Sequence, residues 1–353
     1  MIIHERAARS AERLVDAPGR RDIAPKVSLG GLSGERIQSF ALAKLLNPFC
    51  HEVAKSNDNA RAEGAYNGIV SLYIHERGTR CDKFRVLGGS VERITSTGNK
   101  LIREVRDLEK KARARRESGL FIAEGERLCS EIPAAYIERI FVADDYNGRL
   151  PETAGDTSQR APKIFQVPRE LMEHMSDTKN SQGILAVVRQ KKYTELPGDF
   201  FLILDTLQDP GNVGTIFRTA EAAGVDGILM NRDCVDVYSP KVVRATMGAM
   251  FRMPFMVSDD LPAEIRRMKS KGVQVYAAHL RGTKNHWDFD YRQPTAFMIG
   301  NEGNGLQDEI AALADSYLRI PMMGHTESLN AGVAASVLMY EALRQRKEEE
   351  SDD

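Results

Sequence analysis

The sequence has few cysteines and lacks long apolar runs. Its four cysteines, Cys50, Cys81, Cys129 and Cys234, lie far apart and form no Cys-x-x-Cys pair. This spacing favours reduced thiols, as in a cytoplasmic protein, over disulfides or a zinc site. No run approaches the roughly 20 apolar residues that span a bilayer, so a membrane role is not expected. The amino-terminal segment also lacks the continuous apolar stretch of a secretory signal.

The composition is that of an ordinary globular protein, with 42% hydrophobic and 28% charged residues. Its 353 residues are enough for two or three domains. The formal net charge of −1 hides an acidic tail at residues 348–353, which we expect to be solvated and frayed. The residues before this tail are therefore mildly basic, which permits a nucleic-acid partner without requiring one.

Residues 1–90 show no sustained periodicity. Only residues 33–46 have helix-like apolar spacing, which Pro48 would end. We expect weak or absent structure in this unassigned extension. A real extension and a wrongly assigned start are both compatible with the pattern.

Residues 91–190 alternate between predicted helices and strands, which predicts a small α/β domain. The first helix is expected from about Lys100 to Arg116, with Leu101, Val105 and Leu108 on its apolar face. Its other faces are rich in basic residues, which are candidates for phosphate contact: Arg103, Arg106, Lys110, Lys111, Arg113 and Arg116. A solvated helix face paired locally with Glu104, Asp107 and Glu109 explains the same pattern equally well.

Residues 191–198 are typical of a linker, and residues 199–347 are expected to form a second α/β domain. Continuous apolar strands are predicted at 200–204, 227–230, 273–277, 296–299 and 318–320. Such strands, separated by helices, indicate a parallel sheet that is covered on both faces. Ligands of these sheets bind at the carboxyl ends of the strands.

Three loops at these strand ends carry the candidate functional residues. The first, residues 205–214, leads into a helix that Asn212 is expected to cap and that contains Arg218. It matches neither the dinucleotide nor the P-loop fingerprint, which argues against a nicotinamide dehydrogenase. Arg218 could hold an anion or form a structural ion pair. The second loop, GNEGNGL from Gly300, has three glycines that would let a ligand approach the backbone.

The third loop joins Ile320-Pro321-Met322 to the segment SLNAGVAAS that starts at Ser328. Small residues on the following helix suit close approach to another backbone, a ligand or a second subunit. Taken in order, the three loops resemble the motifs of the SpoU (TrmH-like) 2′-O-ribose RNA methyltransferases of the SPOUT superfamily. The segment 94–188 is similar to the family's ribosomal-protein-L30-like substrate-binding domain.

The resemblance implies a parallel-sheet domain with a carboxyl-terminal trefoil knot, a homodimer, and S-adenosylmethionine as methyl donor. By position, the cofactor contacts fall on Gly300, Ile320, Met322 and Leu329, with Leu280 beside them. The helix 331–336 is expected to pack the knot and the partner subunit.

The catalytic residues implied by the resemblance are Arg218, Asn212, Glu302, Ser328 and Asn330. An arginine is a poor base because its guanidinium stays protonated at physiological pH. We therefore expect it to hold the neighbouring phosphate and to stabilise the alkoxide. Asn212 would position the ribose or Arg218, and Glu302 would orient Arg218 or an RNA group. The resemblance favours large-subunit ribosomal RNA over tRNA. The alternative from another class is a non-catalytic RNA-binding protein on the same fold.

Overall fold

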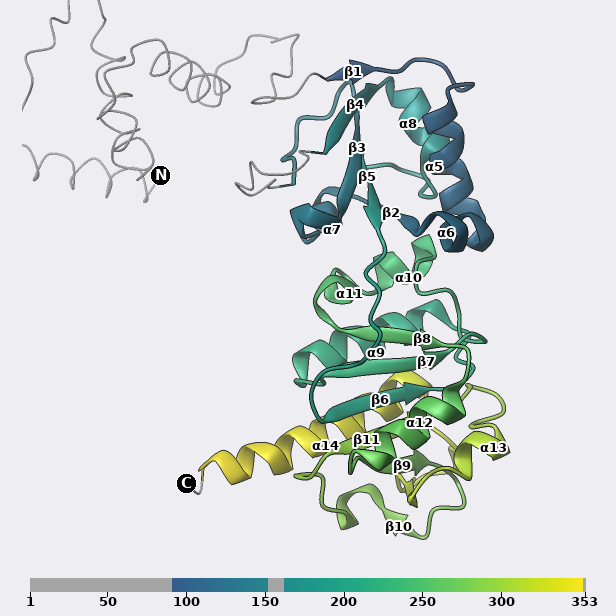
Figure 1. Ribbon diagram of the computed structural model, residues 1–353, viewed down its shortest axis with the longest axis vertical. Helices are drawn as coiled ribbons and strands as arrows, with labels where there is room; N and C mark the ends of the chain where they lie inside the picture. Colours follow the sequence, from purple (N-terminus) through teal and green to yellow (C-terminus); the bar gives the residue numbers. More distant parts are fainter. Residues whose placement is uncertain (1–90, 152–161, 352–353) are drawn as a thin grey trace, which may run out of the picture. The chain divides into compact units, whose positions relative to one another are not determined.

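The computed structural model describes residues 91–151 and 162–351, which contain two β-sheets, one of five strands and one of seven (Figure 1). The helix expected within residues 33–46 and the weak structure expected for residues 1–90 lie outside the described residues. Within the described residues, no helix is both long enough and apolar enough to cross a membrane.

The five-stranded sheet has the order β1-β4-β3-β5-β2. Its strands are β1 (Glu92–Arg93), β2 (Leu120–Glu124), β3 (Ile137–Ala143), β4 (Lys163–Val167) and β5 (Ile184–Arg189). Strand β5 runs antiparallel to both β2 and β3, whereas β4 is parallel to β1 and β3. The sheet is therefore mixed, and the ends of its strands do not all meet at one edge.

The helices of this first part are α5 (Lys100–Lys110), α6 (Ala112–Ser118), α7 (Glu126–Ser130), the 3₁₀ helix η2 (Ala134–Tyr136) and α8 (Arg169–Met175). The single helix expected at 100–116 is wrong, because extended backbone at Lys111 separates α5 from α6. Asn99 caps α5 by accepting a hydrogen bond from the Leu101 amide at 2.8 Å. The helix buries Ile102 rather than Leu101 beside Val105 and Leu108.

Buried polar groups of α5 and α6 connect this part to the rest of the chain. Arg115 is 4% exposed, and its guanidinium pairs with Asp236 at 2.8 Å. It also donates to the Leu108 carbonyl at 2.6 Å. Local pairing of Glu109, which was one of the two explanations of the basic helix, is not observed, because both of its carboxylate oxygens are buried without a hydrogen-bond partner among the described residues. Burial, together with the charges of Glu124 and Asp177, raises the pKa of Glu109 to about 8.

The seven-stranded sheet is parallel throughout and has the order β10-β12-β9-β11-β6-β7-β8. Its strands are β6 (Phe200–Leu204), β7 (Gly227–Asn231), β8 (Phe255–Ser258), β9 (Gln274–Ala278), β10 (Lys284–Asn285), β11 (Thr295–Ile299) and β12 (Ser316–Arg319). The five predicted strands are confirmed, with shifts of one or two residues at their ends. The predictions missed β8 and β10, which are short strands at the two edges.

Helices cover both faces of this sheet (Figure 1). They are α9 (Pro210–Ala222), α10 (Pro240–Ala245), α11 (Ala249–Arg252), α12 (Leu261–Ser270), η3 (His286–Asp288), α13 (Asp308–Ala311) and α14 (Ala331–Ser351). Helices α12 and α13 bury Ile265 and Ile310 against Ile203 of β6 on one face. On the other face, the Arg346 guanidinium of α14 lies 4.7 Å from the ring centre of Phe200. This alternation along β6 follows from the period-two geometry of a strand.

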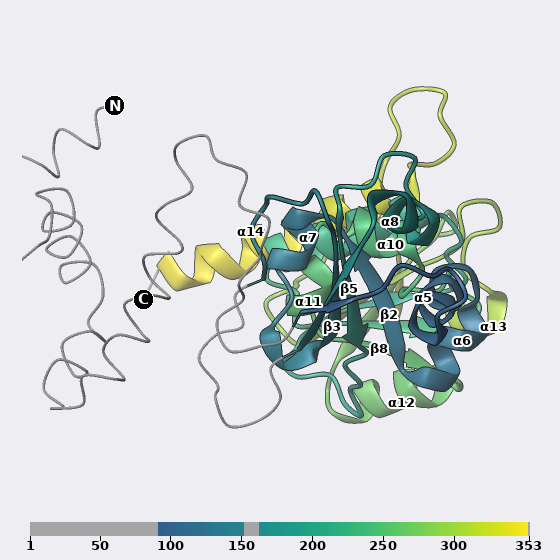
Figure 2. The same cartoon turned by 90° about the horizontal axis from the view of Figure 1, so that it is seen from above.

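Helix α14 packs closely on α9. A Cβ added at Gly332 would lie 3.3 Å from the Thr215 side chain, so at this position the small residue leaves room for α9. Ser336 donates a hydrogen bond to the Thr219 hydroxyl at 3.2 Å, and Ala335 is fully buried. Both figures show the carboxyl-terminal half of α14 extending beyond the sheet (Figure 2). The acidic tail was expected to be frayed. Helix α14 instead runs to Ser351, so the first residues of the tail are helical.

The trefoil knot stays a prediction, because strand pairing does not by itself define how a chain is threaded.

Candidate active site

The predicted site residues follow strands that are neighbours in the seven-stranded sheet. Strands β12, β9, β11 and β6 are adjacent and parallel, so their carboxyl ends meet at one edge. Ile320 follows β12, Leu280 follows β9, Gly300 follows β11, and the loop to Asn212 follows β6. This edge therefore brings together loops that are up to about a hundred residues apart in the sequence.

The start of α9 places Asn212 in the site. The helix begins at Pro210, and Asp209 is its cap, since the Asp209 carboxylate accepts a hydrogen bond from the Asn212 amide at 2.8 Å. The expectation that Asn212 caps the helix is therefore wrong. Instead, Asn212 lies in the first turn, and its side chain is free to make contacts with other loops. Asn212 itself is 7% exposed, whereas its contacts with the other loops are partly buried.

Asn212 joins the other two motifs through its amide group. Its Nδ2 donates to Glu302 Oε1 at 2.8 Å, and its Oδ1 accepts from Asn330 Nδ2 at 2.8 Å. Asn330 Oδ1 in turn accepts from the Gly332 amide at 3.0 Å, at the start of α14. The structure therefore brings together three predicted site residues in one hydrogen-bonded chain, Glu302–Asn212–Asn330.

Glu302 is held as a carboxylate. Burial alone would raise its pKa, but the Asn212 amide and the backbone amides of Gln208 and Asp209 donate to it and lower the pKa overall. It is therefore ionised near neutral pH and accepts hydrogen bonds. The structure pairs Glu302 with Asn212, and this pairing, rather than a contact with Arg218, is what fixes the carboxylate.

A buried carboxylate that the sequence analysis did not single out organises the same loops. Asp205 is fully buried directly after β6. It accepts hydrogen bonds from Asn231 Nδ2 at 2.8 Å, from the Gln307 amide at 2.8 Å and from Gln307 Nε2 at 3.1 Å. Desolvation raises its pKa despite these donors. The signal in the sequence was a lone acid following five apolar residues, a position where parallel sheets place functional or positioning groups.

The glycine-rich loop folds back on itself. Asn301 and Gly305 exchange two backbone hydrogen bonds of 2.9 Å, and Asn301 Nδ2 donates to the Thr206 carbonyl at 2.8 Å. A Cβ at Gly300 would lie 2.2 Å from the Gly305 carbonyl carbon and from the Leu306 nitrogen. At Gly300 the close approach is therefore made by the loop's own backbone, so a ligand is not needed to explain this glycine.

Arg218 lies in the third turn of α9 and is exposed. It forms no ion pair or hydrogen bond within the part of the chain that the structure describes, which argues against a structural ion pair. A helix turns about 100° per residue, so Arg218 lies on a different side of α9 from Asn212, six residues earlier. Ser328 is also exposed, in the loop between β12 and α14.

The residues expected to contact the cofactor include exposed apolar side chains. Leu280 is 80% exposed beside the end of β9, and Ile320, Met322 and Leu329 are half-buried in the loop after β12. A large apolar side chain exposed at the end of a buried strand suits a ligand that would cover it. These residues therefore fit a nucleoside-containing cofactor. No cluster of three or more His, Cys, Asp or Glu suited to a metal ion occurs among residues 91–151 and 162–351.

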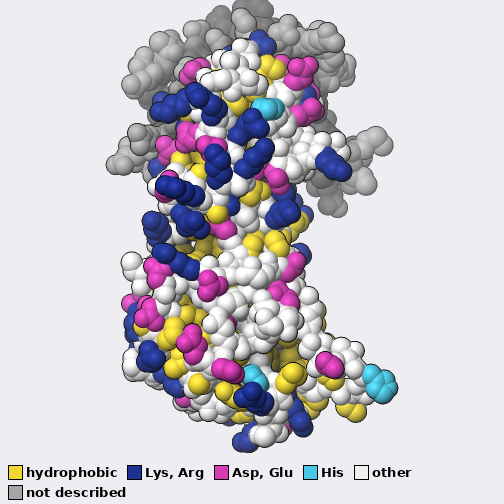
Figure 3. All heavy atoms as spheres, turned by 90° about the vertical axis from the view of Figure 1, so that its right-hand side faces the viewer, with side chains coloured by type: hydrophobic (Ala, Val, Ile, Leu, Met, Phe, Trp, Pro, Cys, Tyr) yellow, Lys and Arg dark blue, Asp and Glu magenta, His cyan; other side chains and the backbone are white. Residues whose placement is uncertain are grey.

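The predicted RNA-contacting residues divide into two groups. Arg106 contacts His174 at 2.7 Å, Lys111 pairs with Asp107 at 2.7 Å, and Arg113 pairs with Glu117 at 2.6 Å. The others are exposed and have no ion pair among the described residues: Arg103, Lys110 and Arg116. Three of the six basic residues thus make local contacts, and the other three are available to contact RNA phosphates. Figure 3 looks onto the side of the molecule where α5 and α6 lie, and it shows Lys and Arg side chains gathered in that region.

Comparisons with known proteins agree with this geometry. The family described as "SpoU rRNA Methylase family" matches residues 199–340, and the "MRM3-like substrate binding domain" matches residues 99–186. An uncharacterized tRNA/rRNA methyltransferase from Synechocystis is 32% identical over 74% of this chain and 96% of its own length. The 23S rRNA (guanosine(2553)-2′-O)-methyltransferase RlmP from Bacillus subtilis is 29% identical over 71% of this chain and 98% of its own length.

Solved structures show the same relationship. The AdoMet-bound rRNA methyltransferase from Sinorhizobium meliloti has a TM-score of 0.63 and 30% identity, covering 72% of this chain and 98% of that one. The SpoU methyltransferase AviRb from Streptomyces viridochromogenes, in complex with AdoMet, has a TM-score of 0.62 and 27% identity, covering 70% and 98%.

The fold and its loops define an S-adenosylmethionine-dependent methyltransferase that acts on rRNA or tRNA. More specifically, the chain belongs to the SpoU rRNA methylase family, and its parallel sheet is that of the SPOUT methyltransferases.

Proposed function

We propose that this enzyme methylates a ribose 2′-hydroxyl of 23S ribosomal RNA. The observation that carries the proposal is the chain Glu302–Asn212–Asn330, which joins all three motif loops at one edge of the sheet. A relative that covers most of this chain is a 23S rRNA 2′-O-methyltransferase by name, which supports both the hydroxyl and the RNA.

The reaction requires an oriented 2′-oxygen, a route for its proton and stabilisation of the charge that develops on it. Arg218 is exposed and has no ion pair with any residue in the described ranges, so it can hold the phosphate next to the target ribose and stabilise the forming alkoxide. Asn212 is fixed by two partners, so it is a positioning residue. Its Glu302 partner is ionised and lies at the mouth of the site, where it can accept a hydrogen bond from the ribose.

Backbone and apolar groups of three loops would hold the cofactor: Gly300, Ile320, Met322, Leu329 and Leu280. When bound, S-adenosylmethionine supplies a methyl group that its sulfonium already activates. We assign Ser328 and Asn330 to the floor of the site. Asn330 is tied both to Asn212 and to the first amides of α14, so it fixes the loop that borders the cofactor residues.

We further propose that residues 91–190 are the RNA-binding domain and residues 199–347 the catalytic domain, joined by the linker 191–198. Strand β5 ends at Arg189 and β6 begins at Phe200, which agrees with a linker between them. Arg103, Lys110 and Arg116 would contact phosphates in the RNA-binding domain.

A homodimer is proposed from exposed apolar residues on α14. Val333 is 47% exposed and Tyr340 is 50% exposed. They are seven residues apart and so lie on one side of the helix, which is the pattern of an interface. We place the enzyme in the cytoplasm, where bacterial ribosomal RNA is made and modified.

The test is to map ribose 2′-O-methylation in the RNA of a deletion strain and its parent. The proposal predicts that one or a few sites in 23S rRNA lose methylation and regain it on complementation. Loss of methylation in tRNA alone would show that tRNA, and not 23S rRNA, is the substrate. An unchanged methylation map in all RNAs would reject the proposed 2′-O-methyltransferase function.

A further inference from the structure

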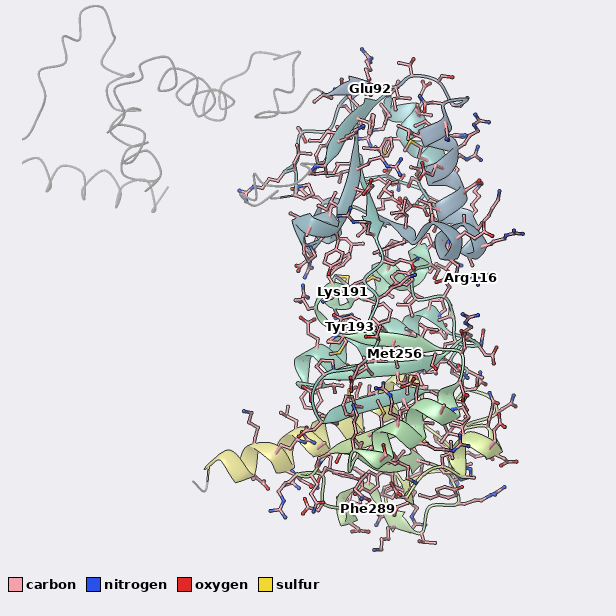
Figure 4. All side chains as sticks on the ribbon, in the orientation of Figure 1. Glu92, Arg116, Lys191, Tyr193, Met256 and Phe289 are labelled. Atoms are coloured by element: carbon pink, nitrogen blue, oxygen red, sulfur yellow. The ribbon has the colours of Figure 1, made fainter. Side chains whose placement is uncertain are left out.

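A groove lies beside the linker, outside the candidate active site. It has a volume of about 810 Å³, and its walls come from the end of α6, the linker, the loop after β7 and strand β8. Figure 4 labels four of its residues: Arg116 from α6, Lys191 and Tyr193 from the linker, and Met256 from β8. The volume lies in the range of ligand sites, about 300–1,000 Å³.

The charges in the groove favour an anion. Its lining holds four cations, Arg116, Lys191, Lys192 and Arg232, but one acid, Asp236. Asp236 is already neutralised by the buried Arg115 at 2.8 Å. Arg232 pairs with Asp259 outside the lining. The excess positive charge therefore remains available to a ligand.

Two of these cations have no partner. Arg116 and Lys192 are exposed, and neither forms an ion pair or a hydrogen bond with any residue in the described ranges 91–151 and 162–351. Cations that line one groove from two segments, α6 and the linker, suit phosphates of a nucleic-acid strand.

The groove also offers flat and apolar surface. Tyr193 is half-buried, and the Lys191 amine lies 4.6 Å from the centre of its ring. Val257 of β8 is 44% exposed. Cations interleaved with an aromatic ring are what single-stranded RNA binds, because phosphates meet the cations while a base stacks on the ring. The free edge of β8 also suits an extended peptide, but the cation excess favours RNA.

Hydrogen bonds connect the groove to the catalytic loops, and Asn231 makes two of them. Asn231 lines the groove, and its Nδ2 donates to Asp205 at 2.8 Å while its Oδ1 accepts from the Thr206 amide at 3.0 Å. Thr206 in turn accepts a hydrogen bond from Asn301, next to Glu302. Strands β6 and β7 are parallel neighbours, so the loop after β7, which lines the groove, lies at the same edge of the sheet as the site.

We propose that this groove binds the single-stranded RNA that flanks the nucleotide to be methylated, with phosphates at Arg116 and Lys192 and a base against Tyr193. The proposal rests on the proposed function and extends it to a second RNA-contacting surface. Asn231 would link occupation of the groove to the position of the catalytic loop.

Binding of a fluorescein-labelled 12-nucleotide single-stranded RNA of mixed sequence tests the electrostatic part. Anisotropy is measured from 50 to 200 mM salt for the full-length wild type, Arg116→Gln, Lys192→Gln and the double variant. Each lost phosphate contact should lower the slope of log affinity against log salt by about 0.7. The double variant should bind roughly tenfold more weakly at the lowest salt. Arg266→Gln on α12 is the matched control, because Arg266 is exposed, lies outside the groove and has no ion pair in the described part of the chain.

Tyr193→Leu and Tyr193→Phe test stacking. The leucine variant should lose about tenfold in affinity, whereas the phenylalanine variant should retain it because the ring is kept. Unchanged affinity and salt slope in the Gln variants would overturn the proposal and leave the edge of β8 to a peptide. These measurements need no methyl transfer. If the wild type methylates no RNA, the proposed function fails, whereas a wild type that methylates RNA with groove variants that bind normally rejects the groove alone.

Discussion

The two sheets use polar residues in opposite ways. In the mixed five-stranded sheet, polar side chains stabilise the structure: Arg139 of β3 pairs with Glu104 of α5 at 2.7 Å. In the parallel seven-stranded sheet, polar side chains gather at one edge, where Asn212 links Glu302 to Asn330. The difference follows from topology, because only parallel strands bring all their carboxyl ends together. Substitutions in the first sheet should therefore alter stability, and those at the edge of the second should alter chemistry.

The largest expected effect is at Arg218. Arg218→Ala should lower the rate of methyl transfer by roughly 10²–10³-fold if Arg218 stabilises the transition state as proposed, because the variant lacks that charge. The affinity for S-adenosylmethionine, measured by calorimetry, should be unchanged. Arg266→Ala on α12 is the control. Normal turnover by the Arg218 variant would show that this arginine is not part of the catalytic machinery.

The next effect is on stability in the five-stranded sheet. Glu104→Ala leaves Arg139, whose side chain is 13% exposed, without its carboxylate. The free energy of unfolding should fall by about 2 kcal/mol, which is less than for a fully buried pair because Glu104 is partly exposed. Urea denaturation measures it, and a double-mutant cycle with Arg139→Ala isolates the pair. Equal stability of the wild type, the two single variants and the double variant would show that this ion pair does not stabilise the five-stranded sheet.

Asn212→Ala tests whether polar residues at the edge of the seven-stranded sheet affect methyl transfer more than stability. It removes both hydrogen bonds that join the motif loops, so the methyl-transfer rate should fall by about tenfold. The urea midpoint should change little compared with that of Glu104→Ala. A variant that unfolds easily but retains its rate in the folded state would show that Asn212 is structural.

The smallest effect concerns pH. Burial holds the pKa of Glu109 at about 8, above its ordinary value of 4.5, so the folded state keeps a proton that the unfolded chain loses. The contribution of protonated Glu109 to the free energy of unfolding is fully present below about pH 4.5 and is lost as the pH rises to about 8. Glu124 and Asp177 raise the pKa, whereas Arg244 and Arg115 oppose them.

Glu109→Gln should therefore gain stability relative to the wild type as the pH rises from 5 to 9, and should flatten the decline in stability between pH 5 and 8. Unfolding by urea at several pH values measures this. An identical pH profile in the two proteins would mean that Glu109 is ionised in the fold.

The sequence predicts the catalytic domain better than the junction between the domains. Continuous apolar strands such as Phe200–Leu204 indicate a parallel sheet, and its topology places the motif loops at one edge. No local pattern reveals that Asp209, and not Asn212, caps α9, since both residue types cap helices well. The break at Lys111 and the burial of Arg115 depend on tertiary contacts, so a basic helical pattern could not show them.

The central claim is that this enzyme methylates ribose and not a base. The direct measurement is to incubate 23S rRNA from the deletion strain with the enzyme and methyl-labelled S-adenosylmethionine, and to separate the digested nucleosides by mass spectrometry. The account predicts label in a 2′-O-methylnucleoside, with none when Arg218→Ala replaces the wild type. Label in a base-methylated nucleoside would contradict it.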